Sequence, residues 1–122
     1  MPTPAEKSEF LLLLRQPSGP PPPPEVFGPI MAQFAEWMKG LYAQGIVVAT
    51  QGLDITGKVV HGPRATAVVS DGPYAEGKEI VGGYVLIKVT SQKQALAAAS
   101  KCPGLDYGMV VEVRQIKTYR AS

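Results

Sequence analysis

The residues that could do chemistry gather in one short stretch in the second half of the chain. Asp71, Glu76, Lys78 and Glu79 place three carboxylates and one amine within nine residues. A carboxylate in an enclosed apolar site has a raised pKa and can transfer protons near neutral pH. Asp71 and Glu76 are therefore candidate catalytic residues, and Lys78, Glu79 and the nearby Tyr74 are candidate ligand-binding residues.

The same stretch also has a structural interpretation. Asp71-Gly72-Pro73-Tyr74 is a strong turn signal, in which the Asp71 carboxylate would accept hydrogen bonds from the backbone N–H groups that follow it. Lys78 and Glu79 could form a solvated ion pair, worth only ~0–1 kcal/mol. From the sequence alone, the turn and the site both remain open for Asp71.

Three more reactive side chains lie outside this stretch. His61, the only histidine, could carry a proton, and Arg64 could bind an anion if it points inward. Both lie in a predicted hairpin next to Gly62-Pro63, where an exposed position is the alternative. Cys102, the single cysteine, lies at the end of a predicted helix, which disfavours a thiolate nucleophile. The sequence contains no phosphate-binding loop, nucleophile elbow or metal motif, so we predict no cofactor and no metal.

The composition excludes several classes of protein. The 122 residues match one domain, predicted over 1–122, and the net charge of +2 is too small to indicate nucleic-acid binding. One cysteine cannot form an internal disulfide. The longest apolar run, Phe10 to Leu14, is far too short to span a membrane, and we see no export signal. We therefore expect a cytoplasmic protein with neither nucleic acid nor membrane as a partner.

The apolar patterns predict an α+β fold. Residues 1–8 should be a flexible N-terminus, and 16–28 a Pro-rich loop. Ser91 and Gln94 form a capping box at the start of the second helix. A small hairpin, 58–61 with 65–70, is inserted before the third main strand. The main strands are predicted at Phe10–Leu14, Ile46–Thr50, Tyr84–Thr90 and Met109–Ile116, and the helices at Pro29–Gln44 and Gln92–Lys101.

This order is a ferredoxin-like split βαβ arrangement, an antiparallel sheet with a hairpin insertion and two helices on one face. The first and last strands are then neighbours. Arg15 ends the first of these strands, and Glu112 and Arg114 share one face of the last. That placement predicts a cross-strand ion pair.

The predicted central strands are apolar on both faces. Leu11 and Leu13 point opposite to Leu12, and Tyr84 and Leu86 alternate with valine and isoleucine in the same way. Two helices cover only one face, so something else must cover the second. A second copy is the simplest cover, because twofold dimers are the commonest oligomers. The alternative is that the Pro-rich loop folds over this face.

Several stretches together resemble the YCII-related (DGPF) family. They are Gln51–Leu53, Ser70–Glu79 with its Asp-Gly-Pro, Gly82–Ile87, Ala97–Pro103 and Val111–Arg114. The resemblance implies a dimeric α+β barrel of the muconolactone-isomerase type, in which a cavity often lies between sheet and helices. It carries no established activity, although some members have a transcription-initiation label.

The sequence departs from the family pattern at three places. Tyr74 replaces the usual phenylalanine, and Gly77 the usual threonine. The predicted first helix, Pro29–Gln44, lacks the histidine that forms a suspected acid–base pair in better-studied relatives, so no catalytic pair carries over.

Two functional hypotheses follow. The first is a homodimeric small-molecule-binding or isomerase-like domain with a pocket near the 71–79 loop. The second is a non-catalytic regulatory or protein-interaction module. An enclosed cavity lined by Asp71 and Glu76 would favour the first, and a filled interior with these carboxylates in water the second.

Overall fold

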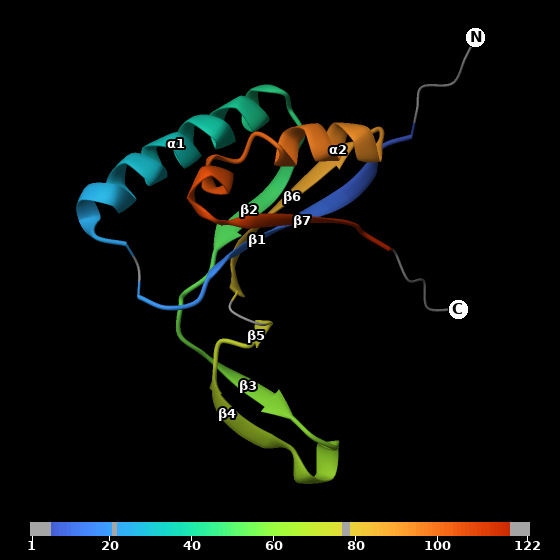
Figure 1. Ribbon diagram of the computed structural model, residues 1–122. Helices are drawn as coiled ribbons and strands as arrows, with labels where there is room; N and C mark the ends of the chain where they lie inside the picture. The colour runs from blue at the N-terminus through green and yellow to red at the C-terminus, as the bar shows by residue number, and fades with distance from the viewer. Residues whose placement is uncertain (1–5, 21, 77–78, 118–122) are drawn as a thin grey trace.

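The fold is built around one antiparallel sheet (Figure 1). The computed structural model describes residues 6–20, 22–76 and 79–117, with only the backbone of 75–76. The strands run in the order β2-β6-β1-β7, and β5 adds a short pairing to β6. Their bounds are β1 Ser8–Pro17, β2 Val47–Gly52, β5 Ala75–Glu76, β6 Glu79–Val89 and β7 Val110–Gln115.

Both helices, α1 (Pro24–Ala43) and α2 (Gln92–Ala99), lie on one face of this sheet (Figure 1). The inserted hairpin consists of β3 (Gly57–His61) and β4 (Val68–Gly72), joined through the 3-10 turn η1 (Arg64–Thr66). A second 3-10 turn, η2 (Pro103–Tyr107), follows α2. The predicted ferredoxin-like α+β fold is confirmed. In the described ranges, no helix is long and apolar enough to cross a membrane.

The Pro-rich connection is shorter than predicted at both ends. β1 continues to Pro17, and α1 begins at Pro24, five residues before Pro29. Pro24 takes the first-turn position that we had assigned to Pro29, where a missing N–H costs nothing. Pro29 then lies inside the helix. Residues 1–5 of the N-terminal segment predicted to be flexible lie outside the described residues.

Small residues let α2 lie close to the sheet. Ala95, Ala98 and Ala99 are buried, and Cys102 just beyond them is buried too. One half of the predicted capping box is present, because the Ser91 hydroxyl oxygen accepts a hydrogen bond from the Gln94 N–H at 3.2 Å. The Gln94 side-chain oxygen accepts from the Thr90 N–H, at 2.8 Å, where the capping box would use the Ser91 N–H.

The core between helices and sheet is filled by large side chains. Leu12, Val85 and Ile87 are fully buried, and Trp37 of α1 packs in the same cluster. The Trp37 indole N–H donates to the Ala98 carbonyl at 3.1 Å, which ties α1 to α2. The buried indole thus meets its hydrogen-bonding requirement inside the core.

A β-bulge interrupts the pairing of β6 with β1. Leu14 is opposite Gly83 but Arg15 is opposite Val81, so Gly82 is the extra residue. A Cβ on Gly83 would lie 2.9 Å from the Gln51 carbonyl oxygen, which shows how closely β2 approaches β6 here. At Gly82 the nearest atoms belong to the end of the Gln16 side chain.

We expect Gly83→Ala to lower the free energy of unfolding by roughly 1–3 kcal/mol, because the β2 backbone would have to move. Gly82→Ala is the matched control. It should cost less than about 1 kcal/mol, since the Gln16 side chain can rotate away. Urea titration followed by far-UV circular dichroism measures both. Equal losses would show that the approach of β2 is not the constraint.

Candidate functional site

Asp71 lies in a strand and not in the turn that we predicted. It is the next-to-last residue of β4, directly opposite Lys58 of β3, and its carboxylate forms an ion pair with the Lys58 amine. This cross-strand partner replaces the backbone N–H groups that we expected it to bind. The Asp71 side chain is 89% exposed. The carboxylate therefore stands in bulk water and lines no enclosed cavity.

The other predicted site residues are also not gathered around a cavity. His61 in β3, Arg64 in η1 and Tyr74 after β4 are all exposed. Glu76 contributes only described backbone, in β5 opposite Glu79. Lys78 lies outside the described residues.

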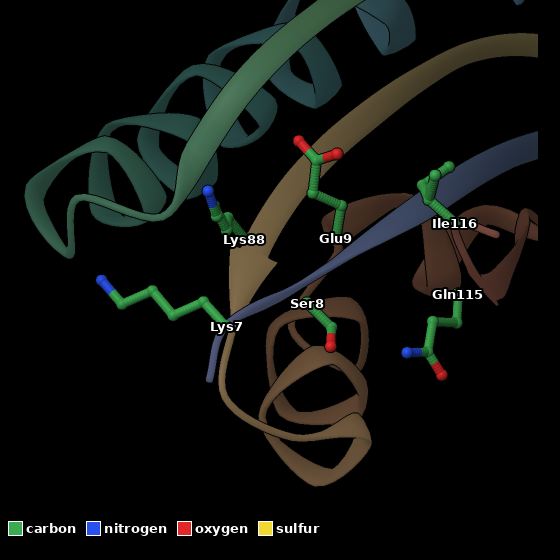
Figure 2. A pocket seen from close by; sticks show the side chains of 6 residues that line it. All are labelled: Lys7, Ser8, Glu9, Lys88, Gln115 and Ile116. Carbon is green, nitrogen blue, oxygen red and sulfur yellow. The ribbon is translucent and has the colours of Figure 1, made fainter. Parts of the chain in front are cut away.

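None of the predicted site residues lines either of the two most defined hollows on the described surface. The first, about 290 Å³, lies at the end of the sheet and is lined by Lys7, Ser8, Glu9, Lys88, Gln115 and Ile116. Figure 2 shows the Lys7, Glu9 and Lys88 side chains extending to one side of the sheet, and those of Ser8 and Gln115 to the other. Its charges are exposed, so water competes for any ligand here.

The second hollow is apolar and lies between α2, η2 and β7. It measures about 270 Å³ and is lined by Leu96, Ala99, Ser100, Leu105, Val111 and Val113. It contains no titratable group. This second hollow lies between α2 and the sheet, on the side where the family resemblance implied a cavity, but it is open and none of the predicted site residues lines it.

The face of the sheet opposite the helices, here called the open face, combines apolar and charged side chains. Strand register places Leu11 between Leu86 and Arg114, and Leu13 between Tyr84 and Glu112. The leucines and Tyr84 are only half-buried in the single chain.

An ion pair lies on this open face. Both Nε and Nη2 of Arg15 lie 2.9 Å from one Glu112 carboxylate oxygen. Arg114 approaches the other oxygen only to 4.0 Å. The predicted ion pair between the first and last strands is present, with Arg15 as the main cation. Its side chain is 17% exposed, so the charge is held largely out of water.

Glu79 adds an unsatisfied carboxylate oxygen. On the N-terminal side of the bulge, Ile80 pairs with Gln16 and is buried. Because side chains alternate along a strand, Glu79 and Val81 then point to the open face, as Arg15 does. Among the described residues, Oε2 of Glu79 is shielded from solvent and has no hydrogen-bond partner. Such an atom costs free energy unless something donates to it.

Cys102 is not placed for nucleophilic chemistry. Burial is the main cause that raises the pKa of its thiol, and hydrogen bonds from the backbone N–H groups of Gly104 and Leu105 offset this only in part. Burial is therefore the main reason that the thiolate is disfavoured, whereas the sequence analysis attributed this to the end of the helix.

No metal centre is formed by the described residues, because no three His, Cys, Asp or Glu side chains come together. The chemistry available is that of one ion pair and one unpaired carboxylate oxygen beside apolar side chains. This arrangement can bind a small, partly apolar molecule that carries a hydrogen-bond donor.

The fold and this surface define a small ferredoxin-like α+β domain with one uncovered sheet face. The chain belongs to the YCII-related domain family, whose model matches residues 17–120. A comparison with curated proteins gives no match. The family resemblance seen in the sequence is thereby confirmed.

Sequence reasoning named Glu79 but missed why it matters, and it treated Arg15 and Glu112 as structural. Simple alternation along β6 would not place Glu79 correctly, because the bulge at Gly82 reverses the pattern. The glycine pair 82–83 was the one available signal, since glycine inside a strand often marks a bulge.

We expect Glu112→Gln to lower the free energy of unfolding by about 1 kcal/mol, a modest value because Glu112 is 38% exposed and partly screened. Arg114→Gln is the control and should change it by ~0–0.3 kcal/mol, because that contact is long and exposed. Thermal and urea unfolding at low and high salt measure both. Equal effects would contradict the assignment of Arg15 as the main partner.

Proposed function

We propose that the protein is a homodimer that binds a small molecule on the open face of its sheet, at the end where Arg15, Glu112 and Glu79 lie. The observation that carries this proposal is the shielded, unpaired carboxylate oxygen of Glu79. Glu79 closes the 71–79 segment, so the proposed site adjoins the loop that the sequence singled out. Its centre is the sheet face and not Asp71.

The apolar character of the open face supports dimerisation. Leu11, Leu13, Tyr84 and Leu86 give the open face the apolar centre that a dimer interface needs.

The same residues indicate the chemistry of the ligand. A hydroxyl or amine of the ligand would donate to Glu79, and its apolar part would lie against Leu13 and Tyr84. The Arg15–Glu112 pair would fix a further polar group. An isomerase-like reaction would use the Glu79 carboxylate as the proton acceptor, whereas simple binding requires only the hydrogen bond.

The interaction-module alternative has its own support. Asp71 stands in water and the interior between sheet and helices is filled, which is the pattern that we expected for a non-catalytic module. This support concerns the inserted hairpin and the interior, and it does not concern the open face.

Leu13→Lys should convert the dimer to a monomer of about 13.0 kDa, because an unpaired charge buried in the interface costs several kcal/mol. Met31→Lys, at a helix position that is 47% exposed, is the control and should remain dimeric. Multi-angle light scattering across the micromolar range measures the mass. A wild-type protein that is monomeric throughout would rule out the dimer.

Ligand binding can be tested with Glu79→Gln. A library of small hydroxy- and amino-compounds is screened for those that raise the Tm of the wild type, since ligand at 100 times Kd adds about 2.7 kcal/mol. We expect Glu79→Gln to weaken binding by roughly 10- to 100-fold, as it alters the acceptor of the proposed hydrogen bond.

Asp71→Asn is the matched control for this test. It removes a carboxylate that is exposed, pairs with Lys58 and is not one of the proposed contacts, so the ligand-induced rise in Tm should be unchanged. If Asp71→Asn abolished binding while Glu79→Gln did not, the site would belong to the hairpin and the open-face assignment would be wrong.

A further inference from the structure

The inserted hairpin, residues 57–72 and here called the arm, extends away from the rest of the domain (Figure 1). β3 and β4 pair extensively with each other and with no other described element. The arm nevertheless has a defined root. The Asp54 carboxylate accepts hydrogen bonds from the N–H and the hydroxyl of Thr56, each at 3.0 Å, directly before β3 begins.

One face of the arm carries a pair of exposed valines. Val60 and Val69 are directly opposite each other and are 67% and 62% exposed. Two residues toward the root, the same face carries the Lys58–Asp71 ion pair. An isolated two-stranded hairpin is only marginally stable in water, so a partner surface on this face would stabilise the arm.

The pattern of this face is self-complementary. β3 contributes Lys58 and Val60, and β4 contributes Asp71 and Val69 at the same levels. A twofold axis that runs along the arm exchanges β3 with β4 when two arms stack face to face. Each Lys58 then lies over the partner's Asp71, and each Val60 over the partner's Val69. Opposite charges and apolar groups therefore meet without any change of sequence.

We propose that, in the homodimer, the two arms stack on each other through the Val60 and Val69 face, with Lys58 paired to the partner's Asp71. The inference rests on the proposed dimer, and it requires that the twofold axis of the sheet-face contact also runs along the arm.

The test uses cysteine cross-linking between two different full-length chains. One chain carries Val60→Cys and the other Val69→Cys, and the two are co-expressed and treated with a short bismaleimide that joins two thiols. We expect a cross-linked heterodimer on denaturing gels, because stacking places these two positions face to face at the roughly 10 Å spacing of packed sheets. Native Cys102 adds little background, since it is only 3% exposed.

Val68→Cys is the matched control partner for Val60→Cys. Val68 is 53% exposed on the same strand as Val69, but it pairs with His61 and lies on the opposite face of the arm. This combination should cross-link at least roughly tenfold less, because the two cysteines cannot meet in the stacked geometry. Val60→Lys should also weaken the dimer by roughly tenfold or more while leaving the Tm of the domain nearly unchanged.

The outcomes distinguish a failure of the arm contact from a failure of the dimer itself. Selective Val60–Val69 cross-linking supports the arm contact. A wild-type dimer with no selective cross-link, and with Val60→Lys still fully dimeric, overturns the arm contact and leaves the sheet-face dimer intact. A wild-type monomer overturns both. An arm that is bound by a different protein would produce the second outcome.

Discussion

The structure depends on the packing of two central strands that are apolar on both faces. β1 and β6 pair along almost their whole length, and Leu12, Val85 and Ile87 fix one face against the helices. Two helices cannot cover two faces, so the apolar residues that point the other way remain half-buried in the single chain. The proposed dimer and the proposed ligand site both follow from that imbalance.

The β-bulge at Gly82 decides which chemistry reaches the open face. Without it, alternation would turn Glu79 toward the helices and Ile80 outward. With it, Ile80 is buried and Glu79 lies on the side of Arg15. One extra residue thus places a carboxylate beside a charged pair at the end of an apolar surface, as is common where bulges re-aim side chains.

Much of the fold was predictable because local signals agreed. The Ser91–Gln94 cap, the small residues of α2 and the apolar strands each pointed to the observed order. The start of α1 was not predictable, because Pro24 and Pro29 are equally acceptable in a first turn. Asp71 was misplaced because its turn signal competes with cross-strand pairing to Lys58, which is thirteen residues away in the sequence. The face to which Glu79 points depends on the bulge. It was not predictable, because strand register is set by tertiary contacts.

The root of the arm has a consequence for how such domains can diversify. Gly57 and Gly72 are cross-strand partners, so the chain leaves and returns at almost the same point. Everything beyond them can be lengthened, shortened or exchanged while the sheet keeps its register, since the core contains no arm residue. The sequence of the insertion, and with it the molecule that the insertion contacts, can therefore change without lowering the stability of the core.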